Sequence, residues 1–118
     1  MADHGLFVGF GFPVRGREEG AVKVFNEFVQ YLAGQAQQGH IESFEPVLLR
    51  PHGGDLGGFF LIRGEGAALA QMTASDEFQR LVTRAQTIVE HFGVVEGLMG
   101  QALQGQMQSF LPDTADLR

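Results

Sequence analysis

The chain lacks cysteine altogether, and its basic side chains are few. Without cysteine it can form no disulfide, no thiolate metal site and no cysteine nucleophile. Eight Lys and Arg stand against 14 Asp and Glu, which gives a formal net charge of −6. Nucleic-acid binding depends on clustered Lys and Arg that contact phosphates. This balance therefore argues against nucleic acid as a partner.

Long hydrophobic runs are also absent. No apolar segment approaches the roughly 20 residues that span a bilayer, and residues 1–5 lack the features of a secretory signal. We therefore expect a cytoplasmic protein without a membrane partner. A length of 118 residues is enough for one domain with its own core. We expect that domain to span residues 1–111, with a loose C-terminal tail over 112–118.

Glycine, by contrast, is abundant at 17 residues, and a glycine-rich turn joins two apolar segments near the middle of the chain. Residues 41–49 and 58–63 each read as a β-strand, and residues 50–57 between them favour a chain reversal. The pattern predicts a β-hairpin around which the rest of the chain is organised. Pro46 predicts that the first of these strands lies at a sheet edge, because proline cannot donate to a neighbouring strand.

The spacing of apolar residues predicts the other elements. In chain order they are a strand over 6–12, a helix over 17–38, a helical turn over 66–72, a helix from about 75 to 92, a strand over 93–99 and a weak helix over 101–110. The order strand, helix, strand, strand, helix, strand is that of the ferredoxin-like fold. We therefore expect an α+β domain with a four-stranded antiparallel sheet and two helices on one face.

Both faces of the hairpin are apolar, although two helices cover only one face of such a sheet. Pairing about the turn predicts Leu48, Arg50, Phe59, Leu61 and Arg63 on one face. It predicts Val47, Leu49, Phe60 and Ile62 on the other. A second copy of the sheet is the simplest cover, which would give a homodimer through the open sheet face. The alternative is that the terminal helix folds back over this face in a monomer.

A short motif carries a resemblance to a known superfamily. The sequence Ser75-Asp76-Glu77-Phe78 through Leu81 resembles the Ser-x-Glu-Phe opening of the second helix in the dimeric α–β barrel superfamily. That superfamily includes YCII-related, EthD-like, stress-responsive barrel and antibiotic monooxygenase-like proteins. The resemblance covers roughly residues 5–99 as architecture and implies the fold and the dimer. The chain lacks the tryptophans that quinol-type monooxygenases use. The His–Asp pair of YCII-like proteins lies at other positions in the chain than His52 and Asp55, so its proposed chemistry is not carried over to these two residues.

Polar residues are expected to gather where three loops leave the same end of the sheet. They are Arg15, Arg17, Arg50, His52, Asp55 and His91. One interpretation makes His52 a general base, Asp55 the carboxylate that orients it, and Arg50 the group that stabilises an anion. The other is that Asp55 binds the backbone of its turn and His52 is solvated. His91 is predicted to end the second helix, where a cation complements the helix dipole, and is also a candidate for ligand binding with Arg15.

Arg63, Phe59 and Leu61 are further candidates for ligand binding, with the arginine as a clamp for a carboxylate. Alternatively, Arg50 and Arg63 pair with Glu45, Glu65 or Glu96, or their aliphatic stems lie along the barrel wall. The four histidines do not form a zinc motif, so we expect no metal and no cofactor. A metal held by His52, Asp55 and a third group is the weaker alternative.

These features together predict a homodimer that binds a small organic molecule. One hypothesis is a cofactor-free enzyme that acts on an aromatic or carbonyl compound by proton transfer or oxygenation. The alternative is a binding or assembly module without an active site. An enclosed cavity into which His52 points would favour the enzyme.

Overall fold

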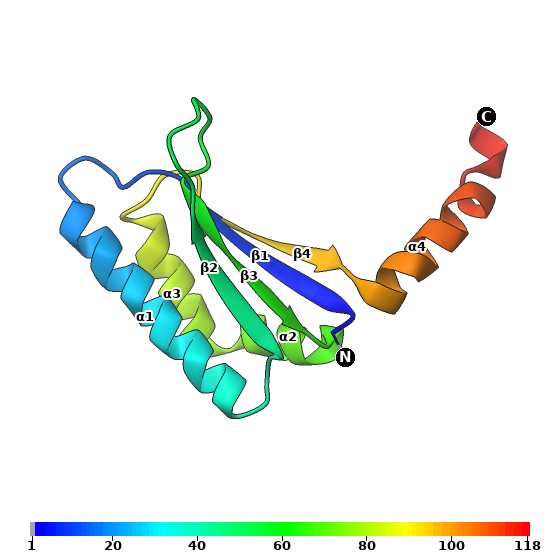
Figure 1. Ribbon diagram of the computed structural model, residues 1–118, viewed down its shortest axis with the longest axis horizontal. Helices are drawn as coiled ribbons and strands as arrows, with labels where there is room; N and C mark the ends of the chain where they lie inside the picture. Colours follow the sequence, from blue (N-terminus) through cyan, green and yellow to red (C-terminus); the bar gives the residue numbers. More distant parts are fainter. Residues whose placement is uncertain (1) are drawn as a thin grey trace.

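The computed structural model describes residues 2–118 and has the predicted ferredoxin-like order (Figure 1). The elements are β1 (His4–Phe10), α1 (Glu18–Gln37), β2 (Ser43–Leu48), β3 (Gly58–Gly64), α2 (Gly66–Ala74), α3 (Asp76–Gln86), β4 (Gly93–Leu98), α4 (Gly100–Asp113) and the 3-10 turn η1 (Ala115–Leu117). The four strands form an antiparallel sheet in the order β2-β3-β1-β4. Pro46 therefore lies in an edge strand, as predicted.

Ser75 separates α2 from α3. Its side-chain oxygen accepts the N–H of Phe78 at 3.2 Å, as expected for a residue that begins a helix. Asp76 and Glu77 occupy the first turn of α3, where carboxylates complement the helix dipole. The helix ends at Gln86, six residues before the predicted end at Phe92. The prediction failed because the apolar side chains beyond Gln86 belong to a segment that pairs with the loop after β1, through a Pro13–Val89 bridge.

The core lies between the sheet and the helices α1, α2 and α3. Leu6 and Val8 of β1 alternate with outward residues and are buried beside Phe60 and Ile62 of β3. The helices contribute Val24, Phe28, Leu32, Leu69, Met72, Phe78, Leu81 and Ala85. In Figure 1, α1 and α3 run along one face of the sheet, and no helix covers the opposite face, which we call the open face.

The register corrects one prediction about the hairpin. Val47 pairs with Phe59 and Leu48 with Gly58. Residues opposite each other share a face, so Val47 lies with Phe59 and Leu61 on the open face, while Leu48 lies on the helix side. The prediction placed Leu48 with Phe59 and Leu61, which is one residue out of register in β2. A shift of one residue moves every side chain of a strand to the other face of the sheet.

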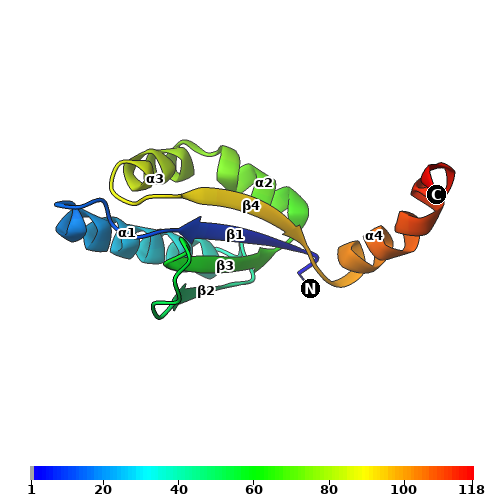
Figure 2. The ribbon, with the colours of Figure 1, turned by 90° about the horizontal axis from the view of Figure 1, so that it is seen from above.

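Helix α4 projects away from the rest of the molecule (Figures 1 and 2). None of its residues is buried. The radius of gyration is 16.3 Å, against about 13.5 Å for a compact chain of this length. The predicted alternative, a terminal helix folded over the open face of its own sheet, is therefore not the observed arrangement. Among residues 2–118, no helix combines the length and hydrophobicity needed to cross a membrane.

Candidate functional site

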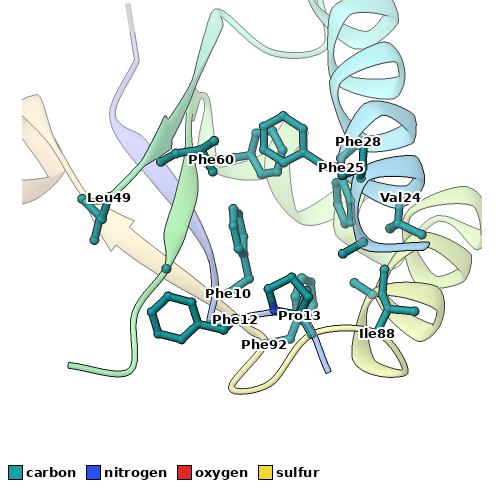
Figure 3. A pocket seen from close by; sticks show the side chains of 17 residues that line it. Phe10, Phe12, Pro13, Val24, Phe25, Phe28, Leu49, Phe60, Ile88 and Phe92 are labelled. Carbon is teal, nitrogen blue, oxygen red and sulfur yellow. The ribbon is translucent and has the colours of Figure 1, made fainter. Parts of the chain in front are cut away.

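A cavity of about 480 Å³ lies on the helix side of the sheet (Figure 3). It is formed by the first half of α1, the hairpin end of the sheet and the segments that flank it. The lining residues are Phe10, Gly11, Phe12, Pro13, Ala21, Val22, Val24, Phe25, Phe28, Leu48, Leu49, Gly57, Phe60, Ala85, Ile88, Val89 and Phe92. The volume is within the usual range for small-molecule pockets.

Aromatic rings that pack against one another form part of the cavity wall. Phe25 and Phe28 come from one stripe of α1, while Phe10 and Phe60 come from the sheet face that α1 covers (Figure 3). The ring centroids of Phe25 and Phe60 are 5.1 Å apart, and those of Phe10 and Phe25 are 6.1 Å apart in an edge-to-face arrangement. Such rings offer both faces and edges to a flat apolar ligand.

Close backbone contacts hold the end of the cavity together. The N–H of Gly11 donates to the carbonyl of Glu90 at 2.7 Å, and the N–H of Gly57 donates to the carbonyl of Phe10 at 2.7 Å. A Cβ at Gly11 would lie 2.7 Å from the Glu90 carbonyl oxygen, and one at Gly57 would lie 2.8 Å from that of Gly11. Only glycine lets these three segments approach so closely. The loops around the cavity are thus fixed by main-chain bonds.

No lining side chain is ionisable or carries a hydrogen-bonding group. The wall therefore excludes charge, because an unpaired polar group transferred into it would lose its hydrogen bonds to water. Three lining side chains are nevertheless largely in solvent: Phe12 is 50% exposed, Val22 62% and Leu48 69%. We call these three residues the mouth of the cavity. An apolar rim of this kind is typical of a binding surface.

The predicted polar rim lies at the same end of the sheet, in exposed loops. His52 is held by its own turn: its Nδ1 accepts the N–H of Gly54 at 3.2 Å, and its Nε2 donates to the carbonyl of Leu56 at 2.8 Å. Asp55 lies instead near His91, with Oδ2 4.0 Å from Nε2. The structure therefore does not bring His52 and Asp55 together as an oriented base, and neither lines the cavity.

The remaining rim residues are separated from one another. His91 does not end α3 as predicted, but follows it by five residues, with a φ of 54° that is uncommon outside glycine. Arg15, Arg17 and Arg50 are exposed. Their side chains make no ion pair or hydrogen bond within residues 2–118.

The other predicted ligand-binding residues lie on the open face. Arg63 forms an ion pair with Glu45 across neighbouring strands, which is the structural alternative stated above. Phe59 stacks on Phe7, with ring centroids 4.9 Å apart. Leu61 is partly buried beside them. The sheet thus separates these three residues from the cavity.

Two carboxylates have perturbed pKa values, and both lie outside the cavity wall. The pKa of Asp3 is lowered chiefly by its contact with the His4 imidazole, 2.9 Å away, and also by the N–H of Gly66. The pKa of Glu27 is lowered chiefly by Arg84, whose Nε and Nη2 each donate to one carboxylate oxygen at 2.9 Å. Asp3 thus ties the start of β1 to α2 through Gly66, and Glu27 with Arg84 ties α1 to α3, so both carboxylates have a structural role.

The sequence predicted no cavity on this side of the sheet. The one signal in the sequence is the excess of phenylalanine, 11 residues in all, but because these residues follow the strand and helix periods they also fit an ordinary core. The part of the chain that the structure describes contains no cluster of three or more His, Asp or Glu side chains placed to hold a metal ion.

Comparison with solved structures defines the class of protein. A dimeric ferredoxin-like protein of unknown function from Jannaschia sp. matches with a TM-score of 0.61 at 17% identity, over 82% of this chain and 98% of that one. A dimeric ferredoxin-like protein of unknown function from Bacteroides fragilis matches with a TM-score of 0.59 at 13% identity, over 81% and 96% of the two chains.

SnoaB, a cofactor-independent oxygenase from Streptomyces nogalater, matches with a TM-score of 0.51 at 20% identity, over 84% of this chain and 93% of that one. No family model matches the sequence, and no curated protein is similar enough to serve as a relative. At these identities the likeness shows the fold. The chain therefore has the ferredoxin-like fold that the resemblance to the dimeric α–β barrel superfamily implied.

Proposed function

We propose that this protein binds a small apolar molecule with a flat aromatic part in the cavity between α1 and the sheet. The observation that carries this proposal is a cavity of about 480 Å³ whose lining side chains are all uncharged and incapable of hydrogen bonding. The binding energy would come from removing apolar surface from water, at roughly 25 cal/mol per Å². The cluster of contacting rings in the wall, Phe10, Phe25, Phe28 and Phe60, favours an aromatic ligand over an aliphatic one.

We propose further that the protein acts as a homodimer through the open face. Phe7, Phe59, Leu61 and Val95 give this face an apolar surface that no helix within residues 2–118 covers. Matched proteins of this fold are dimeric, which supports the same assembly here. The proposed dimer leaves the cavity of each protomer on the far side of its sheet.

The test of ligand binding is a fluorescence titration with the neutral probe N-phenyl-1-naphthylamine. Ala21 lines the cavity, so Ala21→Phe places a ring inside it and should weaken binding about tenfold or more. Ala33→Phe is the matched control, because Ala33 lies on the same helix and is exposed. Bound probe should also raise the melting temperature of the unmodified chain. Equal binding by both variants would place the probe elsewhere and overturn the proposal.

Cofactor-free oxygenation of an aromatic or carbonyl compound is the second candidate function. The fold shared with a cofactor-independent oxygenase supports it. A dry aromatic cavity would suit such chemistry by excluding water from a reactive intermediate. The measurement is dioxygen consumption in the presence of a hydroxylated aromatic compound that displaces the probe. The oxygenase function would be established if the unmodified protein and Ala33→Phe consumed oxygen and Ala21→Phe did not. Binding without oxygen consumption would show that the protein binds its ligand but does not oxygenate it.

A further inference from the structure

The exposed large apolar side chains fall into separate groups. One group is the mouth of the cavity, Phe12, Val22 and Leu48. A second lies on the edge strand β4, with Val95 on the open face. The third lies on the C-terminal segment and consists of Leu103, Met107, Phe110, Leu111 and Leu117.

Helix α4 has the composition of a segment that is covered by protein. Leu103, Met107 and Phe110 are 47%, 67% and 56% exposed, and their spacing of four and three residues places them on one stripe. Residues 99–112 contain no Asp, Glu, Lys or Arg, although charged residues make up 19% of the chain. The opposite side of the helix carries glutamines, such as Gln101 and Gln108. A free helix in water usually carries charge on its surface, so this composition points to a partner.

The mouth and α4 lie at opposite ends of the molecule. The mouth includes Phe12, just beyond the end of β1, whereas β4 runs antiparallel to β1 and carries α4 away from the other end (Figures 1 and 2). The longest dimension of the chain is 52 Å, and α4, about 21 Å long, occupies one end of it. Helix α4 therefore cannot cover the mouth of its own chain.

We propose that α4 of a second copy of this chain covers the mouth of the cavity. When the two-fold axis of the dimer runs across the strands, α4 of each protomer, which we call its arm, comes to the mouth end of the other protomer, and the contact occurs twice. Both patches are uncharged, which matters because two chains of net charge −6 repel each other wherever their carboxylates approach. The proposal rests on the homodimer and the cavity of the proposed function.

The consequence is that each ligand site is incomplete in a single chain. The mouth residues of one protomer and the stripe of its partner would together close the cavity over the ligand. A bound molecule could then leave only when the arm lifts, so the arm would set the rate of release. The test needs one measurement of the arm's position and one of ligand release.

The absence of cysteine makes the position measurable by disulfide cross-linking in the full-length chain. The double variant Leu48→Cys/Phe110→Cys should form a covalent dimer, twice 12.9 kDa, on mild oxidation. The matched control is Val95→Cys/Phe110→Cys, which reports an arm on the partner's open face. The proposal would be overturned if only the control formed a linked dimer, if the single variant Phe110→Cys formed one, or if none of the variants did.

Release is measured as the dissociation rate of N-phenyl-1-naphthylamine by stopped flow. Met107→Ser/Phe110→Ser should accelerate release about tenfold, because the arm no longer adheres to the mouth. Gln108→Ser, on the opposite side of α4, is the control and should leave the rate unchanged. Equal rates for both variants would overturn the role of the arm. A cross-linked dimer that binds no probe would refute the proposed ligand site while retaining the position of the arm.

Discussion

Phe7 stacks on Phe59 across two neighbouring strands of the open face, with ring centroids 4.9 Å apart and planes inclined by 28°. The stack is possible because Gly9, which pairs with Phe59, carries no side chain beneath the ring of Phe7. The ring of Phe7 therefore lies over the backbone at Gly9, and the ring of Phe59 stacks against it. The two rings give the open face an apolar surface of the kind that packs against another sheet.

A charge on this surface should dissociate the proposed dimer. Leu61 lies next to Phe7 in register, so Leu61→Glu would place one carboxylate from each protomer in the apolar interface. We expect the dissociation constant of the dimer to rise about 100-fold or more. Light scattering across a concentration series should then show a particle of 12.9 kDa. Thr83→Glu, on the exposed side of α3, should leave the mass unchanged. An intact dimer of Leu61→Glu would exclude the open face as the interface.

Gly9→Ala should displace the ring of Phe7. A Cβ at Gly9 would lie 2.5 Å from a ring carbon of Phe7, so the ring must move and lose its stack on Phe59. We expect the free energy of unfolding to fall by about 1–3 kcal/mol in urea titrations. Gly34→Ala is the control, because no atom lies within 4 Å of its Cβ position in α1. That change should stabilise the protein by up to about 1 kcal/mol. A neutral Gly9→Ala would mean that the ring has room to turn.

The order of the elements could be predicted from the sequence because it depends on local periodicity. The stripe of α1 and the alternation of β1 and β3 are properties of single segments, and the structure confirms them. The register of β2 could not be fixed in this way. It depends on how the long turn closes, and Leu48 consequently lies on the helix side and not beside Phe59.

The cavity could not be predicted for a similar reason. Ile88 and Val89 fit the period of the second helix, but they lie in the segment that pairs with the loop after β1. This pairing, and not the period, places Ile88 in the cavity wall (Figure 3). No pattern along the chain indicates how far apart these contacts hold the helix and the sheet. The same holds for His52, whose spacing from Asp55 suggested a pair that the turn does not form.

Acid should weaken the contact between α1 and α3. The pKa of Glu27 lies below its usual value of 4.5 because Arg84 stabilises the carboxylate. The pair therefore stabilises the folded chain above pH 4.5, and this contribution is lost as the pH falls through the lowered pKa. Glu27→Gln should lower the melting temperature at pH 7 and lower it less at pH 3. Glu19→Gln, exposed on the same helix, should have no effect at either pH. An equal loss at both pH values would show that packing, and not charge, is responsible.

Phe28 connects the cavity to the core. It is 2% exposed, and its ring lies 5.6 Å from that of Phe60 and 6.2 Å from that of Phe78. Phe28→Ala should lower the free energy of unfolding by about 3–5 kcal/mol, because it removes a buried ring and leaves a void. Urea titration measures this change. Val22→Ala, at the exposed mouth, should change it by less than about 0.5 kcal/mol. A small effect of Phe28→Ala would mean that neighbouring rings collapse into the space.

The role of His52 can be separated from that of the cavity. Its two hydrogen bonds lie within an exposed turn, so His52→Ala should change the free energy of unfolding by less than about 1 kcal/mol. Its imidazole does not line the cavity, so the affinity for N-phenyl-1-naphthylamine should not change. Phe12→Ala provides the contrast, because it removes a ring from the mouth and should weaken probe binding several-fold. If His52→Ala lowered the affinity of a fully folded protein and Phe12→Ala did not, the hairpin turn and not the cavity would be the binding site.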